Sequence, residues 1–442
     1  MLTPNRRLLL LLAIVILPLV PSSVSGLDTA LRLDLGLATL LDTRNPAASP
    51  LDSHLAVGVQ LFAFSDQLEV ELELQADSST GDQGLHGALL LDRIRVDWLP
   101  LNRLQINIGR FADNWSPAVA LPALALFTPQ ALPEILPGAP APANPWLIEA
   151  VWYLAQGYLK LQYAPEPPRF YIPDPDTPWF PQASVPEVLS LMMPANGRTF
   201  WYLNELLVTD DRPSATLGTP SAALAAGWSF MRLDLAAVLH YGWNPRLITV
   251  QETSLVFDAE REEQSFDMTV YPYYDRRLAA GLQASGSFRE LWWWMELGGS
   301  PGEAFAIRML ASDTPVVRAP TAAGTAGIGW FLPRSIGTLL LESTWRHIFT
   351  DQAFIAPSLA TASAAALEIT PSLERLQPIT LRLGGLIEYP EHGGAFTAEV
   401  LLDFHPQLTL SLSGAVFYGN KGSLLRSYRD NYPLQLGAIL QF

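Results

Sequence analysis

The chain of 442 residues contains no cysteine, so disulfide frameworks and cysteine-ligated metal sites are excluded. Basic residues are also scarce, because 27 Lys and Arg stand against 43 Asp and Glu and give a net charge of -16. Nucleic acids are bound through clustered Lys and Arg that contact phosphates. We therefore expect no nucleic-acid partner, and also no metal or other cofactor.

Long hydrophobic runs are absent beyond the N-terminus. The nearest candidate, 118–132, is interrupted by Pro122 and Pro129. A helix that crosses a bilayer needs about 20 consecutive apolar residues. The sequence after the N-terminus therefore predicts no membrane-spanning helix.

The N-terminus has the three parts of a secretory signal. Arg6 and Arg7 precede an apolar run at 8–20, and small residues follow it. An uncleaved helical anchor is the alternative, but the run is short for a hydrocarbon core of about 30 Å. We expect a signal peptide at 1–26, export by the general secretion machinery, and a mature chain at 27–442.

Sequence signals of catalysis are weak. The six histidines are scattered and form no His-x-x-x-His pair. The sequence also has no Gly-x-Ser-x-Gly elbow and no glycine-rich phosphate loop. We therefore expect that the protein is not an enzyme.

The dominant pattern is an alternation of apolar and polar residues. In the segment 68–76, Leu, Val and Ala at even positions alternate with Glu and Gln at odd positions. A strand of this kind has one apolar and one polar face, as a barrel with lipid outside and water inside requires. The pattern predicts an all-β, transmembrane, antiparallel up-and-down β-barrel of about 18 strands, within a range of about 16 to 20. The predicted strands are 31–41, 54–64, 68–76, 88–98, 104–111, 145–155, 158–164, 221–230, 232–241, 278–288, 291–299, 322–331, 336–347, 362–370, 379–389, 395–404, 408–418 and 432–442.

The connections between the predicted strands are of two kinds. Short links such as 156–157 and 289–290 largely alternate with long ones. Outer-membrane barrels have short periplasmic turns and longer outer loops. We therefore expect periplasmic termini and long extracellular loops at 112–144, 165–220 and 242–277.

The final segment has apolar residues at alternate positions and ends on an aromatic residue. This arrangement resembles the C-terminal signal by which the barrel-assembly machinery recognises outer-membrane barrels. A buried last strand of a soluble protein is the alternative, but the combination with an N-terminal secretory signal favours the membrane barrel. The residues of the predicted assembly signal are Tyr432, Leu434, Leu436, Leu440 and Phe442.

The stretch Ile108-Gly109-Arg110-Phe111, together with Asn114-Trp115, resembles a Gly-Arg-x-x-x-x-Trp element of porin-like outer-membrane barrels of the alginate-export type. The family element commonly has a polar residue after the Arg and a Gly after the Trp, where this chain has Phe111 and Ser116. The resemblance implies the barrel fold and a general transport role, and it marks Arg110 as a functional candidate. It implies no particular solute. The last fifth of the chain also resembles such barrels, through His405-Pro406, Phe417-Tyr418-Gly419 and Arg429-Asp430-Asn431 ahead of the terminal strand.

If the apolar faces contact lipid, the opposite faces line the lumen with charges of both signs. Rings of charged side chains set ion selectivity in wet pores, but the same charges could instead pair across strands and fill the interior. Arg110 is a special case, because strict alternation places it with Ile108 on the apolar face. A bulge at Gly109 could turn it inward, or it could lie at the headgroup level. The pore-lining candidates are Arg32, Asp34, Glu69, Glu71, Glu73, Arg93, Arg95, Asp97, Arg110, Arg232, Asp234, Glu342, Arg346, Arg382, Glu388, Glu399 and Asp403.

The predicted loop 112–144 is apolar and rich in proline, so it is a poor candidate for extension into water. It could fold into the barrel as a constriction, cover a neighbouring subunit of a homo-oligomer, or lie on the membrane surface, and we favour the first. The aromatic-rich loop 165–220 is a second candidate for a lid or a ligand contact.

A barrel of about 18 strands keeps an aqueous lumen. Together with the charged wall and the lack of a recognisable plug domain before the first strand, this favours a porin-like channel for passive diffusion of small polar or charged solutes. Its surroundings would be the lipid of a bacterial outer membrane. Two other hypotheses stay open: a closed barrel that acts as an adhesin or structural surface protein, and a transporter of hydrophobic solutes suggested by the loop 112–144.

Overall fold

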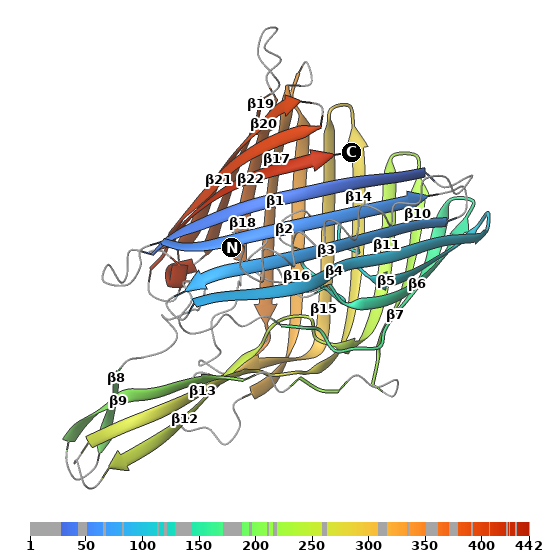
Figure 1. Ribbon diagram of the computed structural model, residues 1–442. Helices are drawn as coiled ribbons and strands as arrows, with labels where there is room; N and C mark the ends of the chain where they lie inside the picture. Colours follow the sequence, from blue (N-terminus) through green and yellow to red (C-terminus); the bar gives the residue numbers. More distant parts are fainter. Residues whose placement is uncertain are drawn as a thin grey trace.

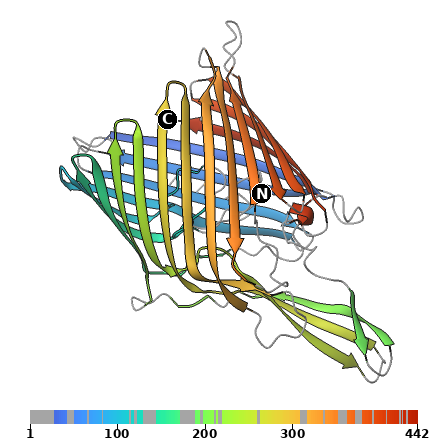
Figure 2. The same ribbon diagram turned by 180° about the vertical axis from the view of Figure 1, so that it is seen from behind.

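A computed structural model describes residues 28–42, 51–64, 68–81, 84–112, 115–118, 122–128, 144–170, 188–193, 197–209, 212–214, 219–258, 263–307, 316–333, 336–350, 361–370, 379–389, 392–405, 407–420, 423, 425–428 and 431–441. Eighteen strands form one sheet that closes into a barrel, as Figures 1 and 2 show from opposite sides. The sheet is closed because β1 (Asp28–Asp42) pairs with both β2 (Leu51–Phe64) and β22 (Asn431–Gln441). Within these described ranges, no helix has the length and hydrophobicity to cross a membrane.

Each barrel strand pairs in an antiparallel manner with the next barrel strand along the chain. The sequence leaves the barrel twice, between β7 and β10 and between β11 and β14, and returns to the same sheet each time. The remaining barrel strands are β3 (Leu68–Gly81), β4 (Gly84–Leu101), β5 (Leu104–Arg110), β6 (Trp146–Leu154), β7 (Gly157–Ala164), β10 (Ser221–Phe230), β11 (Leu233–Trp243), β14 (Arg276–Phe288), β15 (Leu291–Ala306), β16 (Val316–Phe331), β17 (Gly337–Ile348), β18 (Thr361–Ile369), β19 (Ile379–Tyr389), β20 (Gly393–His405) and β21 (Leu408–Tyr418).

The predicted barrel is confirmed, and each of the eighteen predicted strands overlaps a strand of the barrel. The largest difference is in β15, which was expected to end at Gly299 but extends to Ala306. A register shift between Ser300 and Glu303 interrupts the alternation there. The extension matters because it carries Glu303 into the wall of the barrel.

A second sheet of four strands projects from the end of the barrel that carries the long connections (Figure 1). It consists of β8 (Val188–Met193), β9 (Gly197–Val208), β12 (Thr249–Asp258) and β13 (Glu263–Pro272). These strands lie within the connections 165–220 and 242–277, for which the sequence pattern predicts no strands. In β13, Phe266, Met268 and Val270 are buried and alternate with polar residues, so the period-two signal was present in the sequence.

Glycines and aromatic residues interlock in the wall formed by β15, β16 and β17. The indole of Trp294 occupies the space where a Cβ at Gly327 would lie, and that of Trp292 covers Gly329 in the same way. Both glycines are on β16, next to the strand that carries the tryptophans. A side chain on either glycine would displace an indole ring, so this packing favours one register of the two strands.

Candidate functional site: the lumen and its inner loop

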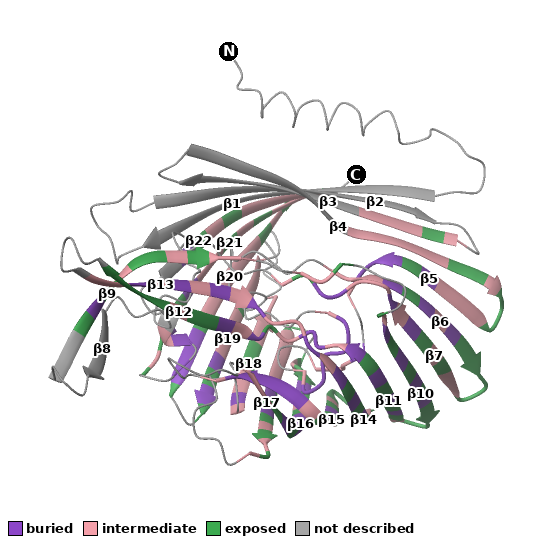
Figure 3. Cartoon of the chain, turned by 90° about the horizontal axis from the view of Figure 1, so that it is seen from below, coloured by how far each residue is buried: buried purple, intermediate pink, exposed green. Residues whose placement is uncertain are grey.

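The two faces of the barrel wall differ in burial. In β10 the outward residues Leu224 and Trp228 are 56% and 52% exposed, whereas the inward residues Ala223 and Ala225 are buried. A small inward residue can be buried only if other atoms lie against it inside the barrel. Figure 3 looks at the end with the long connections and shows chain segments within the ring of strands.

Register places most of the predicted pore-lining residues on the inward face. Arg110 and Arg232 are the exceptions, since Arg232 lies in the turn between β10 and β11. For Arg32, Asp34 and Glu73 only the backbone position is described. The other inward strand residues are Glu69, Glu71, Arg93, Arg95, Asp97, Asp234, Glu342, Arg346, Arg382, Glu388, Glu399 and Asp403.

Several of these charges form ion pairs with each other. Arg93 Nη1 lies 2.8 Å from Glu71 Oε1 on the neighbouring strand, and Arg95 Nε lies 2.6 Å from Asp97 Oδ1. Arg382 contacts both Glu368 and Glu399, at 2.7 and 3.2 Å, while half of its side chain remains exposed. These groups therefore make a hydrated wall of paired charges rather than a ring of one sign.

A segment of the predicted loop 112–144 folds back into the barrel. We call the described residues between 111 and 128 the inner loop. Its apolar side chains are nearly fully buried against inward residues of β10, β11 and β14. Burial of one large apolar side chain contributes about 1.5–3 kcal/mol, so this contact fixes the loop in place. The cluster comprises Phe111, Trp115, Leu124, Leu126, Phe127, Leu147, Ala164, Ala223, Ala225, Ala236, Val238 and Ala279.

One carboxylate of the barrel wall holds the inner loop at two points. Glu296 of β15 is fully buried and accepts a hydrogen bond from the Ser116 hydroxyl at 2.5 Å. The same carboxylate accepts the backbone N–H of Leu124 at 2.9 Å and that of Ala123 at 3.3 Å. Hydrogen bonds to charged groups contribute about 1.5–3 kcal/mol each. Glu296 therefore joins the inner loop to the barrel wall through these three hydrogen bonds.

Two arginines bind the carbonyl groups of the same loop. Arg246 Nη2 donates to Ala123 O at 2.8 Å, and Arg277 Nη2 donates to Ala125 O. Arginine is suited to this role because its guanidinium stays charged and carries five N–H donors. Backbone N–H groups of the loop therefore donate to Glu296, and its carbonyl groups accept hydrogen bonds from Arg246 and Arg277.

Behind the loop, Glu303 lies at the centre of a buried charge cluster. Arg277 Nη1 lies 3.0 Å from Glu303 Oε1, and Arg346 Nη2 lies 2.6 Å from Oε2. Thr321 donates its hydroxyl to Glu303 at 3.0 Å. The Arg277 and Glu303 side chains are only 2% and 3% exposed. Charges so deeply buried depend on one another, because loss of one partner of a buried pair costs about 3–5 kcal/mol.

A separate polar cluster lies on β5, β6 and β7. Glu149 accepts hydrogen bonds from Asn107 Nδ2 at 2.7 Å and from Gln162 Nε2 at 2.8 Å. Lys160 Nζ lies 3.4 Å from the same carboxylate. All of these groups face inward, and they link β5, β6 and β7 on the lumen side of the wall.

Arg110 does not line the open lumen. Register places it opposite Ile94 and Trp146, and its side chain is 7% exposed. Its Nε donates to Asn144 O at 2.6 Å, which joins the two ends of the connection between β5 and β6. Ladder pairing continues through Gly109 without the bulge we considered. The φ of 151° at Gly109 and the closeness of the Ile94 carbonyl both favour glycine there.

A second connection also turns inward, between β21 and β22. Leu425 in the short 3-10 helix η5 (Leu425–Tyr428) packs against inward residues of β18 to β21, among them Leu386 and Phe417. Ser423 donates its hydroxyl to Glu388 at 2.8 Å, so this predicted pore residue is buried beneath the turn. Burial also raises the pKa of Tyr428 to about 12.

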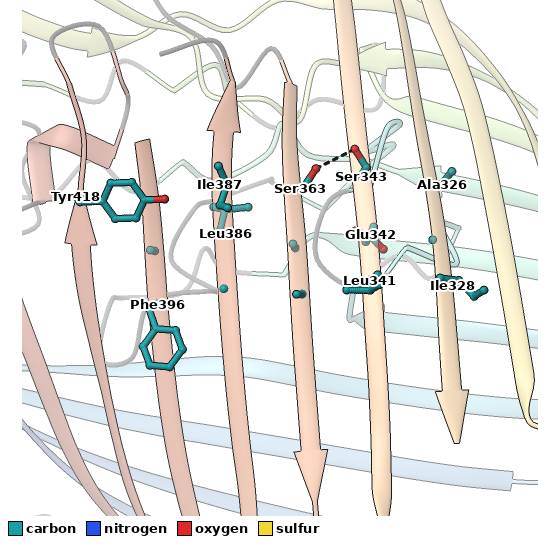
Figure 4. Close-up of a pocket in the computed structure, with 15 residues that line it drawn as sticks. Ala326, Ile328, Leu341, Glu342, Ser343, Ser363, Leu386, Ile387, Phe396 and Tyr418 are labelled. Atoms are coloured by element: carbon teal, nitrogen blue, oxygen red, sulfur yellow. Dashed lines mark hydrogen bonds between the residues drawn. The ribbon is translucent and has the colours of Figure 1, made fainter. Parts of the chain in front are cut away.

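The hollow drawn in Figure 4 lies on the other side of the wall. It has a volume of about 720 Å³ over β16 to β21. Register assigns its side chains Leu341, Ile387 and Phe396 to the outward face. Ser363 donates to Ser343 at 3.1 Å within it. The hollow is therefore an apolar groove on the lipid side and not part of the lumen.

Sequence reasoning missed the residues that hold the inner loop. Glu296, Glu303 and Arg277 have partners that are far apart in sequence, up to 180 residues for Glu296 and Ser116. The strand pattern gave Glu296 an inward position, which was the available signal. Neither Arg246 nor Glu303 belonged to a predicted strand, so their positions could not be inferred from alternation.

Comparisons with known proteins give limited support. No family model and no curated protein matches the chain. Among solved structures, Pseudomonas aeruginosa OccK8 (OprE) is similar, with 8% identity, a TM-score of 0.49, and coverage of 94% of this chain and 98% of that chain. OccK11 (OpdR) from the same organism has 10% identity and a TM-score of 0.48, with 95% and 97% covered. The outer membrane protein opdK has 10% identity, a TM-score of 0.43, and 94% and 99% covered. Because all three TM-scores are below 0.5, these similarities support no conclusion about function. The observations that bear on function are those of the barrel itself.

Proposed function

We propose that the protein is a porin-like channel of the bacterial outer membrane that passes small polar or charged solutes by passive diffusion. The observation that carries the proposal is a closed barrel of 18 strands with apolar side chains outside, paired charges inside, and a loop fixed within the lumen. A barrel of this size keeps an aqueous lumen. The inner loop then narrows the passage on the side of β10 to β15.

Single-channel recording tests this function. The purified, refolded mature chain is added to a planar bilayer with a salt gradient across it. Discrete current steps with a reproducible reversal potential are the expected result. A correctly folded chain that leaves the bilayer silent would contradict the proposal. Heat-modified electrophoretic mobility and tryptophan fluorescence confirm folding in the same preparation.

A surface role for the four-stranded sheet is the second candidate. The sheet projects beyond the barrel and exposes large apolar side chains, including Phe200, Tyr202 and Phe257 at 52%, 61% and 58%. If the protein is an adhesin with a closed barrel, the full chain should conduct no current, and removal of β8 and β9 should abolish its binding to a surface. The hydrophobic-solute hypothesis loses its motivation, since Leu124, Leu126 and Phe127 face the wall and are buried.

Several predictions from the sequence belong to the same proposal. The signal peptide 1–26 and Phe442 fall outside the described residues, and the proposal assigns them to the general secretion and barrel-assembly machinery. It also places the long connections outside the cell and both termini of the chain on the periplasmic side. The Gly109-Arg110 element continues to suggest the alginate-export type. A homo-oligomer would be detected by the mass of the detergent-solubilised protein.

A further inference from the structure

Arginines and aromatic residues gather on the outward rim of the barrel, at the end of the long connections. Trp243 ends β11 and lies opposite Arg276, the first residue of β14. They share the outward face with Tyr241 and Leu278, which are 57% and 42% exposed. Tyrosine and tryptophan at the ends of spanning strands mark the depth of lipid headgroups.

The arginines of this rim are held in fixed positions. The Arg276 guanidinium carbon lies 4.9 Å from the Tyr241 ring centroid and 5.3 Å from that of Trp243. Its Nη2 donates to Pro220 O at 2.8 Å. Arg318 of β16 donates to Arg276 O and pairs with Asp275. Its side chain is nevertheless 56% exposed. Arg318 therefore presents an ordered, accessible cation at the membrane surface.

A second pair of arginines adjoins the first. Arg212 lies 2.8 Å and Arg169 lies 3.6 Å from Glu166, and Arg169 is 48% exposed. Phe170 and Tyr274 connect the two groups, since their ring centroids are 5.3 Å apart. Among the described residues the rim therefore combines four arginines with two carboxylates. This excess of positive charge occurs in a chain whose net charge is -16, so it is a local feature and not an average property.

We propose that this basic rim, Arg169, Arg212, Arg276 and Arg318, binds the phosphate groups of anionic lipid headgroups in the outer leaflet. The inference rests on the proposed outer-membrane location. Guanidinium groups bind phosphate through paired N–H donors. Within the described part of the chain, Arg318 uses two of its five donors. The remaining donors, the exposure and the headgroup depth fit a lipid phosphate that approaches from the membrane side.

Native mass spectrometry of the full mature chain in detergent tests this site. The probe is diphosphorylated lipid A, compared with its dephosphorylated form. The R318Q/R276Q variant should bind diphosphorylated lipid A at least about tenfold more weakly. Because Arg276 also supports the rim backbone, R318Q alone is measured as well and should show most of this loss. The matched control is R289Q, since Arg289 stacks on Phe288 at 5.3 Å in the turn at the opposite end, and it should change binding by less than about twofold.

The outcomes separate this inference from the channel proposal. Equal affinity for the two lipid forms, or equal loss in R318Q and R289Q, would overturn the lipid site. Full competition by inorganic phosphate at millimolar concentration would also overturn it, because the site would then be one for free anions. A chain that binds the phosphorylated lipid but never conducts would retain the lipid site and refute the channel. Conductance of R318Q should equal that of the unmodified chain.

Discussion

Arg382 and Arg277 both face the lumen and both contact glutamates, yet half of the Arg382 side chain is exposed and only 2% of the Arg277 side chain. The first belongs to a hydrated part of the wall, where Arg382 of β19 contacts Glu368 of β18 and Glu399 of β20. The second lies under the inner loop, where the same residue types are excluded from water. Burial thus decides how much the structure depends on a charge pair. Loss of one partner costs about 0–1 kcal/mol for an exposed pair and about 3–5 kcal/mol for a buried one.

The largest expected effect comes from neutralising the buried cluster. Glu303→Gln keeps the side-chain volume but leaves Arg277 and Arg346 without their counter-charge. The free energy of unfolding should fall by about 3–5 kcal/mol, measured by urea unfolding in lipid vesicles. The matched change Glu399→Gln, at the exposed Arg382, should cost less than about 1 kcal/mol. Equal losses for both variants would remove the contrast between the two walls.

The second-largest effect is expected at Glu296, the wall residue that holds the inner loop. Glu296→Ala removes three hydrogen bonds to the loop and should destabilise its inserted position by about 3 kcal/mol. The open channel should then show a larger mean conductance and more current noise at fixed voltage. Glu342→Gln is the control, because the Glu342 carboxylate accepts the indole N–H of Trp294 from the wall itself at 3.1 Å. Identical recordings from both variants would show that Glu296 does not hold the loop.

Two glycine substitutions test the packing of the barrel wall, and their expected effect on stability is smaller. Gly327→Ala places a methyl group where the Trp294 ring lies, and overpacking of this kind costs about 1–3 kcal/mol. Gly385, on the outward face of β19, has open space where its own Cβ would lie, so Gly385→Ala should change stability by less than about 0.5 kcal/mol. Unfolding monitored by tryptophan fluorescence distinguishes them, and a larger loss for Gly385→Ala would contradict the packing described here.

The last effect concerns pH, and it is absent under ordinary conditions because it develops only above about pH 10. Burial raises the pKa of Tyr428 to about 12, compared with about 10 for an exposed tyrosine. The folded state therefore favours the protonated form, so its contribution is intact below about pH 10 and decreases as the pH rises toward 12, by about 2 kcal/mol. Tyr428→Phe should show no such decrease. The stability difference between the two chains at pH 9 and pH 12 measures it, and a constant difference would count against burial of the hydroxyl.

Strand alternation was sufficient to predict the barrel. Each barrel strand meets lipid on one side and water or polar atoms on the other, so its sequence repeats every two residues, as the Leu and Glu residues of 68–76 do. The four-stranded sheet was not predicted from the sequence, because proline-rich connections surround its strands. Its β13 has the same alternation at Phe266 and Met268, but the length of the connection 242–277 favours a loop.

The position of the inner loop could be predicted only in part. The apolar character of 112–144 favoured insertion into the barrel, which Leu124 and Phe127 now show. The residues that hold it could not be found, since Glu296 and Ser116 are 180 positions apart and alternation carries no information on distant partners. Arg110 shows the same limit. Its neighbours in sequence gave its face correctly, but its contact with Asn144 depends on how the loop closes.

The most direct measurement uses the absence of cysteine in the chain. Arg95→Cys places a single thiol on the lumen wall next to Phe111, over whose ring the Arg95 guanidinium lies at 5.1 Å. Single-channel current is recorded before and after a bulky, charged thiol reagent. A stepwise fall in current on labelling is the predicted result, because the side chain would line the conducting path beside the inner loop. Unchanged current with complete labelling, or no current from a folded barrel, would contradict the account.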